Sequence, residues 1–154
     1  MTLETPLSRL STSALEGLPS STRHRQSQLS SLHSALLTNA SALCATLSSN
    51  PHPSFTPAEA EAEYASALDA VRHFYDGIDF AREKEAEYAV AKERSNIERR
   101  VGVGIVVVRP GWHTRFWGVV VPLAAAVAGG NAVVVEVSYM LHGVYKGRGR
   151  GGDM

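Results

Sequence analysis

The residue types that most often carry catalysis are sparse in this sequence. Cys44 is the only cysteine, so the chain offers a single thiol and can form no internal disulfide. A catalytic thiol must be ionised and must lie beside a base. Cys44 lies in a polar, leucine-spaced stretch, far in sequence from the valine-rich region described below. We interpret it as a small helix residue.

The histidines do not have the spacing of a metal site. No two of them are four residues apart, the interval that would place two imidazoles on one helical face for zinc. They stand at positions 24, 33, 52, 73, 113 and 142. We therefore expect no metal.

A glycine- and arginine-rich stretch ends the sequence, at residues 146–152. Such stretches can bind RNA without sequence preference, but three cations are few. The whole chain has 15 basic and 15 acidic residues and a net charge of zero, whereas nucleic-acid-binding domains are usually basic. We expect a disordered tail and no nucleic-acid partner.

The size and composition fit one ordinary domain. The chain has 154 residues, of which 44% are hydrophobic and 19% are charged, so it can bury a core. Residues 1–24 contain no secretory signal pattern, and we expect them to form a flexible polar N-terminus. A single cysteine fits a reducing compartment, and we expect the protein in the cytoplasm.

Two amphipathic helices are expected in the first half. Leucines at positions 29, 32, 36, 43 and 47 fall on one helical face and predict a helix over residues 25–47. Thr56, Pro57 and Glu59 form the start signal of a second helix, whose apolar face is Tyr64, Leu68, Val71, Tyr75 and Ile78. Residues 81–100 are highly charged and predict a solvated helix or a connector.

The second half predicts a strand, a helix and a strand. Residues 101–108 and 132–137 are rich in β-branched residues and uncharged at their centres, as is typical of strands buried on both faces. Residues 116–128 between them are rich in alanine and predict a buried helix, in which Pro122 fits only the first turn. A parallel α/β crossover unit is expected. Residues 116–135 are also uncharged over a length that could span a membrane, which is the minority interpretation.

This second half resembles the start of the coenzyme-binding domain of aldehyde dehydrogenases, most closely the short, fatty-aldehyde (class 3) type. Trp112 stands ten residues before Pro122-Leu123, as in that family. The sequence Ala-Gly-Gly-Asn-Ala-Val-Val-Val follows at residues 128–135, where the family has Ala-Ala-Gly-Asn-Ala-Val-Val. The resemblance covers residues 25–137 and implies an incomplete Rossmann-like domain preceded by N-terminal helices. Residues 138–154 do not match the family.

The resemblance also implies a site. Pro110, Gly111 and Trp112 would line the cofactor and substrate loop. His113 stands where the family has an oxyanion-binding asparagine, and a neutral imidazole can donate one hydrogen bond. Glu136 replaces the lysine that touches the adenosine ribose; its carboxylate can accept from ribose hydroxyls and would repel a 2′-phosphate, which favours NAD over NADP.

The family reaction is the NAD(P)-dependent oxidation of an aldehyde to a carboxylic acid. The regions that carry the catalytic cysteine and glutamate of the family have no counterpart among these residues. We therefore expect a truncated aldehyde-dehydrogenase-like polypeptide that is inactive alone, with NAD as the cofactor, an aldehyde as the substrate and a possible homo-oligomeric state. The alternatives are a non-enzymatic fragment that pairs with a full-length relative, or a membrane-anchored helical protein.

Overall fold

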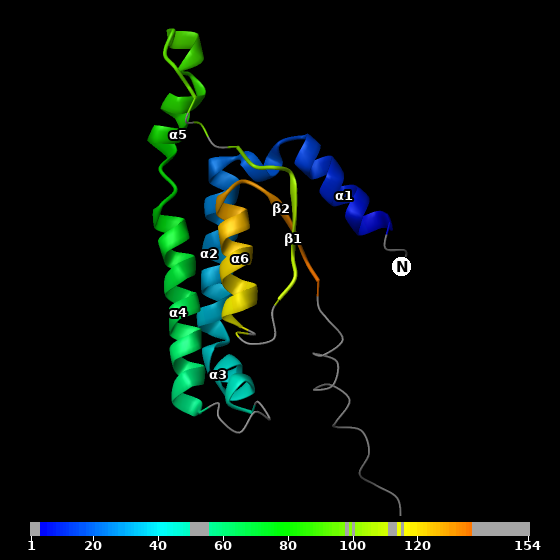
Figure 1. Ribbon diagram of the computed structural model, residues 1–154, viewed down its shortest axis with the longest axis vertical. Coiled ribbons are helices and arrows are strands. Elements are labelled where there is room, and N and C mark those ends of the chain that lie inside the picture. The colour runs from blue at the N-terminus through cyan, green and yellow to red at the C-terminus, as the bar shows by residue number, and fades with distance from the viewer. Residues whose placement is uncertain are drawn as a thin grey trace, which may run out of the picture.

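The computed structural model describes residues 4–49, 56–97, 99, 101–110, 114 and 116–136. Helices come first, and a small parallel sheet follows them (Figure 1). In chain order the elements are α1 (Glu4–Leu15), η1 (Leu18–Ser20), α2 (Thr22–Thr38), α3 (Ala40–Ser48), α4 (Pro57–Asp76), α5 (Phe80–Glu87), η2 (Val90–Lys92), β1 (Ile105–Val108), α6 (Trp117–Ala128) and β2 (Ala132–Val135).

The N-terminal segment has regular structure from Glu4 onward, where we expected a flexible polar terminus. It forms α1 and η1 and the beginning of α2, which starts at Thr22 rather than at residue 25. Gly17, with a φ of 74°, separates α1 from η1. Glycine adopts this left-handed conformation without the strain that a side chain would add. Helix α1 contacts both strands of the sheet.

The leucine-patterned region is helical as predicted, but it is two helices. Leu29 and Leu36 are buried on α2, and Leu43 on α3 packs against the same core. The break falls at Asn39, whose side-chain amide donates to the carbonyl oxygen of Ala35 at 2.8 Å. Asparagine competes in this way for groups that a continuous helix would use, so it favours helix ends.

Helix α4 begins where the start signal predicts. The Thr56 hydroxyl accepts from the Glu59 amide at 3.3 Å, and the Glu59 carboxylate accepts from the Thr56 amide at 2.6 Å. This reciprocal capping box satisfies two amides that have no partner inside the helix. The backbone and hydroxyl hydrogen bonds from Thr56 hold the pKa of Glu59 below its usual value. On the predicted apolar face Tyr64, Val71 and Ile78 are buried, whereas Tyr75 is exposed.

The charged stretch after α4 forms only short helices. Asp79 caps α5 by accepting from the Arg82 amide at 3.1 Å, and α5 ends after two turns at Glu87. One exposed ion pair, between Arg94 and Glu85 at 2.9 Å, joins two parts of this stretch. Of the two structures predicted for residues 81–100, a solvated helix forms up to Glu87, and the described residues after it form a connector that contains η2.

The sheet is the parallel pair that the sequence predicts, with α6 as the connection. Ile105 pairs with Ala132 and Val108 with Val135. The expected burial on both faces is wrong, because Ile105 and Val107 are 37% and 61% exposed whereas Val108 is buried. The architecture is thus mostly helical with a two-stranded parallel sheet, compatible with an α/β fold.

Strand β1 starts later than predicted because residues 101–104 meet the turn between α6 and β2. A Cβ atom on Gly102 would lie 2.1 Å from the carbonyl oxygen of Gly130. The Val103 amide donates to Oδ1 of Asn131 at 2.6 Å, and Nδ2 of Asn131 donates to the Ala126 carbonyl at 3.0 Å. Gly102 therefore serves close backbone packing, whereas the carbonyl oxygen of Gly104 accepts from the Ala132 amide at 2.8 Å.

The uncharged stretch at residues 116–135 is a twelve-residue helix, a turn and a strand, as the Gly-Gly-Asn sequence indicates. Pro122 lies in the second turn of α6, not in the first turn where we expected it. None of the helices in the described part of the chain is both apolar enough and long enough to cross a bilayer.

Replacing Thr56 by alanine tests the capping box. We expect Thr56→Ala to lower the free energy of unfolding by about 1 kcal/mol, because the Glu59 amide loses its acceptor. Urea denaturation followed by circular dichroism measures this change. Thr46→Ala is the matched control: the Thr46 hydroxyl donates only to the Ala42 carbonyl within exposed α3, so that variant should keep the stability of the parent. Equal stabilities of the two variants would contradict the capping role.

Candidate functional site

The carboxyl ends of β1 and β2 lie side by side, because the two strands are parallel and in register. Ligands of open α/β sheets bind at this edge. Arg109 and Glu136 directly follow the two strands. Nε of Arg109 donates to Oε2 of Glu136 at 2.8 Å, and Nη2 donates to Oε1 at 3.2 Å. A bidentate ion pair between Arg109 and Glu136 therefore lies at this edge of the sheet.

This pair is exposed, since the Arg109 and Glu136 side chains are 75% and 48% exposed. The hydrogen bonds and charge of Glu136 raise the pKa of Arg109 further above its ordinary value. A solvated pair of this kind contributes little to stability. It fixes the position of the carboxylate and offsets its charge, and it leaves lone pairs on both oxygens that can accept further hydrogen bonds.

The N-terminus of α6 faces the same end of the sheet. In dinucleotide-binding folds the amides at such a helix start bind phosphate. Here Oε1 of Glu63, on α4, accepts from the amides of Phe116 and Trp117 at 3.1 and 3.0 Å. The next residue of α4, Tyr64, stacks its ring on Phe116 with the centroids 5.8 Å apart. A carboxylate of the protein thus occupies the anion-binding end of this helix.

The structure describes two of the five predicted site residues, Pro110 and Glu136. Pro110, half-buried, follows Arg109 at the edge, and Glu136 lies there as expected. Gly111, Trp112 and His113 lie outside the described residues, so the predicted cofactor loop and oxyanion position stay predictions.

Two residues that shape this edge escaped the sequence argument. Arg109 could have been inferred by aligning the ends of the two predicted strands, which places it beside Glu136. Glu63 is one of several glutamates spaced along α4, and nothing in the sequence distinguishes it from its neighbours.

Cys44 does not have the surroundings of a nucleophile. It is half-buried in α3, and its backbone carbonyl accepts from Ser48 Oγ. The neighbouring Tyr64 phenol has a pKa raised by burial and, to a lesser extent, by the negative charge of an ionised Cys44. A neutral phenol is not a base, and the Tyr64 hydroxyl donates its proton to the Leu36 carbonyl oxygen at 3.0 Å, so Tyr64 does not supply the base that a nucleophilic thiol needs.

Two further findings bear on function. Among the described residues, no three histidine, cysteine, aspartate or glutamate side chains gather closely enough to hold a metal ion. No family model, curated protein or solved structure matches the chain.

The role of Glu63 can be tested by mutation. We expect Glu63→Ala to lower the free energy of unfolding by about 1 kcal/mol, because two helix-start amides lose their acceptor. Glu63→Gln keeps an acceptor oxygen but removes the charge that favours a helix N-terminus, so its loss should be smaller. Chemical denaturation of both variants beside Glu61→Ala, an exposed glutamate of the same helix, provides the measurement. A loss for Glu61→Ala as large as that for Glu63→Ala would contradict a specific cap.

Proposed function

We propose that this chain is an aldehyde-dehydrogenase-like polypeptide containing the first strand–helix–strand unit of a Rossmann-like, NAD-linked coenzyme domain, without turnover of its own. The observation that carries the proposal is the parallel β1–α6–β2 unit with a carboxylate, Glu136, at its carboxyl edge. The family resemblance supplies the reaction, the oxidation of an aldehyde to a carboxylic acid. A reducing cytoplasm, suited to a lone free cysteine, is the proposed location.

Glu136 would accept hydrogen bonds from the adenosine ribose. Its oxygens are fixed by Arg109 and keep lone pairs for this purpose. The carboxylate favours NAD by repelling a 2′-phosphate, and the guanidinium of Arg109 reduces that repulsion. The preference for NAD over NADP should therefore be modest and should increase when Arg109 is replaced by alanine.

The absence of turnover follows from the residues. Aldehyde oxidation through a thiohemiacetal requires a thiolate beside a base. The single thiol, Cys44, is half-buried in α3, and the neighbouring Tyr64 hydroxyl donates to a backbone carbonyl. The N-terminus of α6 is also occupied by Glu63. A coenzyme phosphate would have to displace that carboxylate to reach the helix amides, so we expect weak coenzyme binding.

Coenzyme titration and an aldehyde assay test this proposal together. We expect the purified chain to bind NAD weakly but saturably by calorimetry, with binding reduced several-fold in Glu136→Ala. Glu85→Ala, which removes an exposed carboxylate on α5, should leave binding unchanged. With NAD and a long-chain aldehyde, we expect no NADH above the blank.

The claim of coenzyme binding and the claim of inactivity can be refuted separately. NADH formation would refute the claim of inactivity. Failure to detect NAD binding, or equal affinities of Glu136→Ala and the parent, would refute the coenzyme role.

A second candidate function is association with a full-length relative. Alternate residues along and before β1 present an apolar row on one side of the strand, with Val103 84% and Val107 61% exposed. In the register with β2, the backbone groups of Ile105 and Val107 point away from the partner strand. Parallel sheets are normally covered on both faces, and exposed strand edges favour pairing with another chain.

Co-expression with a full-length fatty-aldehyde dehydrogenase tests this second function. We expect the tagged chain to co-purify with the dehydrogenase, and Val107→Lys to abolish the capture because it places a charge in the apolar row. Val90→Lys, at a residue 68% exposed on η2, is the control and should not change it. Loss of capture in both variants, or a chain that stays alone and monomeric at high concentration, would count against association.

A further inference from the structure

Residues 79–97 form a segment that projects beyond the end of the α2, α4 and α6 bundle and carries α5 and η2 (Figure 1). None of its side chains belongs to the central core cluster. Several of its large apolar side chains are exposed instead, namely Phe80, Tyr88, Val90 and Ile97. The core therefore does little to hold this segment in place.

Both ends of the segment are attached to the body. Ile78, just before it, is 8% exposed in the core, and its carbonyl oxygen accepts from Nε2 of Gln26 at 3.2 Å. After the segment, Gly102 packs against the Gly130 carbonyl. These two fixed points allow the residues between them to move without disturbing the bundle or the sheet.

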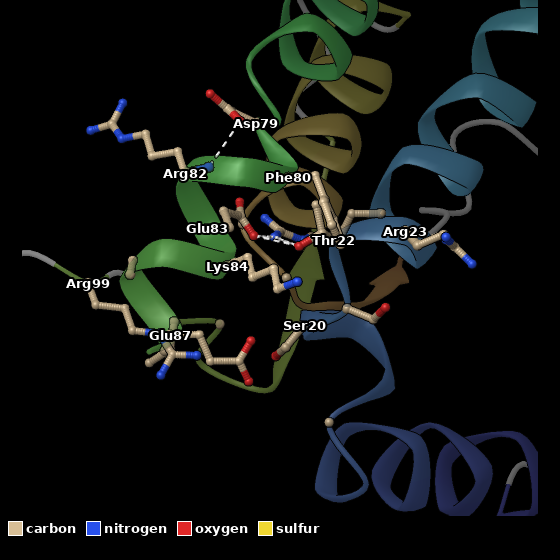
Figure 2. Close-up of a pocket in the computed structure, with 18 of the residues that line it drawn as sticks. Ser20, Thr22, Arg23, Asp79, Phe80, Arg82, Glu83, Lys84, Glu87 and Arg99 are labelled. Atoms are coloured by element: carbon tan, nitrogen blue, oxygen red, sulfur yellow. Dashed lines mark hydrogen bonds and ion pairs between the residues drawn. The ribbon is translucent and has the colours of Figure 1, made fainter. Parts of the chain in front are cut away.

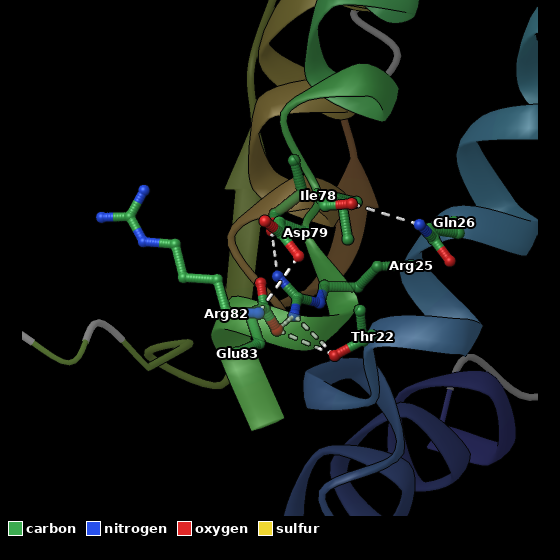
Figure 3. A network of polar contacts seen from close by, with 8 residues as sticks. Thr22, Arg25, Gln26, Ile78, Asp79, Arg82 and Glu83 are labelled. Carbon is green, nitrogen blue, oxygen red and sulfur yellow. Dashed lines mark hydrogen bonds and ion pairs between the residues drawn. The ribbon is translucent and has the colours of Figure 1, made fainter. Parts of the chain in front are cut away.

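One carboxylate joins the segment to the body (Figure 3). Glu83 accepts from the Thr22 hydroxyl at 2.8 Å and forms an ion pair with Nη2 of Arg25. Within the described residues, no other hydrogen bond or ion pair crosses from residues 79–97 to α1, α2, α4, α6 or the strands.

The two partners in this pair differ in how firmly they are held. The Arg25 side chain is 10% exposed, and its Nη1 donates to the Ala128 carbonyl at the end of α6 at 2.8 Å. The Glu83 side chain is already 38% exposed. Arg25 therefore stays in the body when the pair separates. The cost of separation falls mainly on its buried guanidinium, which loses its carboxylate partner, and less on Glu83, which is already partly exposed.

A cleft of about 1510 Å³ lies between the segment and the body. Ser20 and Arg23 line it from the body, and Lys84 and Glu87 line it from the segment (Figure 2). Because one wall belongs to the segment, access to the cleft depends on where the segment lies.

We propose that residues 79–97 are a strap that closes this cleft, and that the pair between Arg25 and Glu83 is the clasp that holds it closed. Separation of the pair lets the strap swing about its two fixed ends, near Ile78 and Gly102. The bundle and the parallel strands keep their structure as the strap moves.

Distance measurement between spin labels tests the strap. In a full-length Cys44→Ser background, labels at Arg23→Cys and Glu87→Cys report on the two walls of the cleft. We expect Glu83→Gln to lengthen the mean distance by about one helix diameter, roughly 10 Å. Thr22→Ala removes one hydrogen bond to Glu83 and should shift the distribution less, in the same direction. Glu85→Gln breaks only the pair with Arg94 inside the strap and should leave the distance unchanged.

Hydrogen exchange on the same variants separates strap opening from unfolding. The proposal requires the amides of α4 and α6 to keep their protection in Glu83→Gln while the distance lengthens. An unchanged distance in Glu83→Gln, or an equal change in Glu85→Gln, would overturn the proposal. Loss of protection in α4 and α6 would also overturn it, because the pair would then belong to the body.

Discussion

Helix α6 can pack against both α2 and α4 because the side chains at the closest contacts are small. Ala67 on α4 and Ala124 on α6 are fully buried, and Leu29 and Val71 fill the space beside them. Alanine on both helices lets the backbones approach closely, and closely packed atoms contribute dispersion energy as well as burial. The sheet depends on this contact, because α6 connects β1 to β2 and packs against both strands. The position of the candidate site at the sheet edge is therefore set by packing in the helical bundle.

The edge of the sheet and the start of α6 differ in the hydrogen-bonding groups that they leave free for a ligand. The edge presents a carboxylate fixed by Arg109 and open to solvent, so it can accept hydrogen bonds from a ligand without large rearrangement. The helix start has already used two amides on Glu63. Only the first of these features resembles the ready ligand site of a dinucleotide-binding fold. The structure thus combines a parallel strand–helix–strand unit with internal satisfaction of the amides at the start of its helix.

Local signals in the sequence predicted the elements that depend on local chemistry. Thr56 and Glu59 marked the start of α4, and the Gly-Gly-Asn sequence separated α6 from β2. The failures involve contacts between distant residues. Gly102 is kept out of the strand by the carbonyl of Gly130, and Glu63 reaches a helix more than fifty residues later. The break at Asn39 was local but was hidden by a leucine pattern that continues across it.

The predictions for the candidate site divide in the same way, between local signals that the sequence shows and packing that it does not show. Glu136 was placed correctly because it follows a recognisable strand, and its partner Arg109 follows the other strand of the pair. The outward face of β1 was mispredicted because an all-valine stretch does not say which of its faces a protein covers. Val108 is buried and Val107 is exposed, although the two side chains are chemically identical.

Asn131 joins the start of the valine-rich stretch to the end of α6 with one side chain, accepting from the Val103 amide and donating to the Ala126 carbonyl. Both halves of its amide are used, so its orientation is determined. An aspartate at this position would have nearly the same size but would set an oxygen against the Ala126 carbonyl. The turn therefore depends on the chemistry of the amide at position 131 and not only on a side chain of that volume.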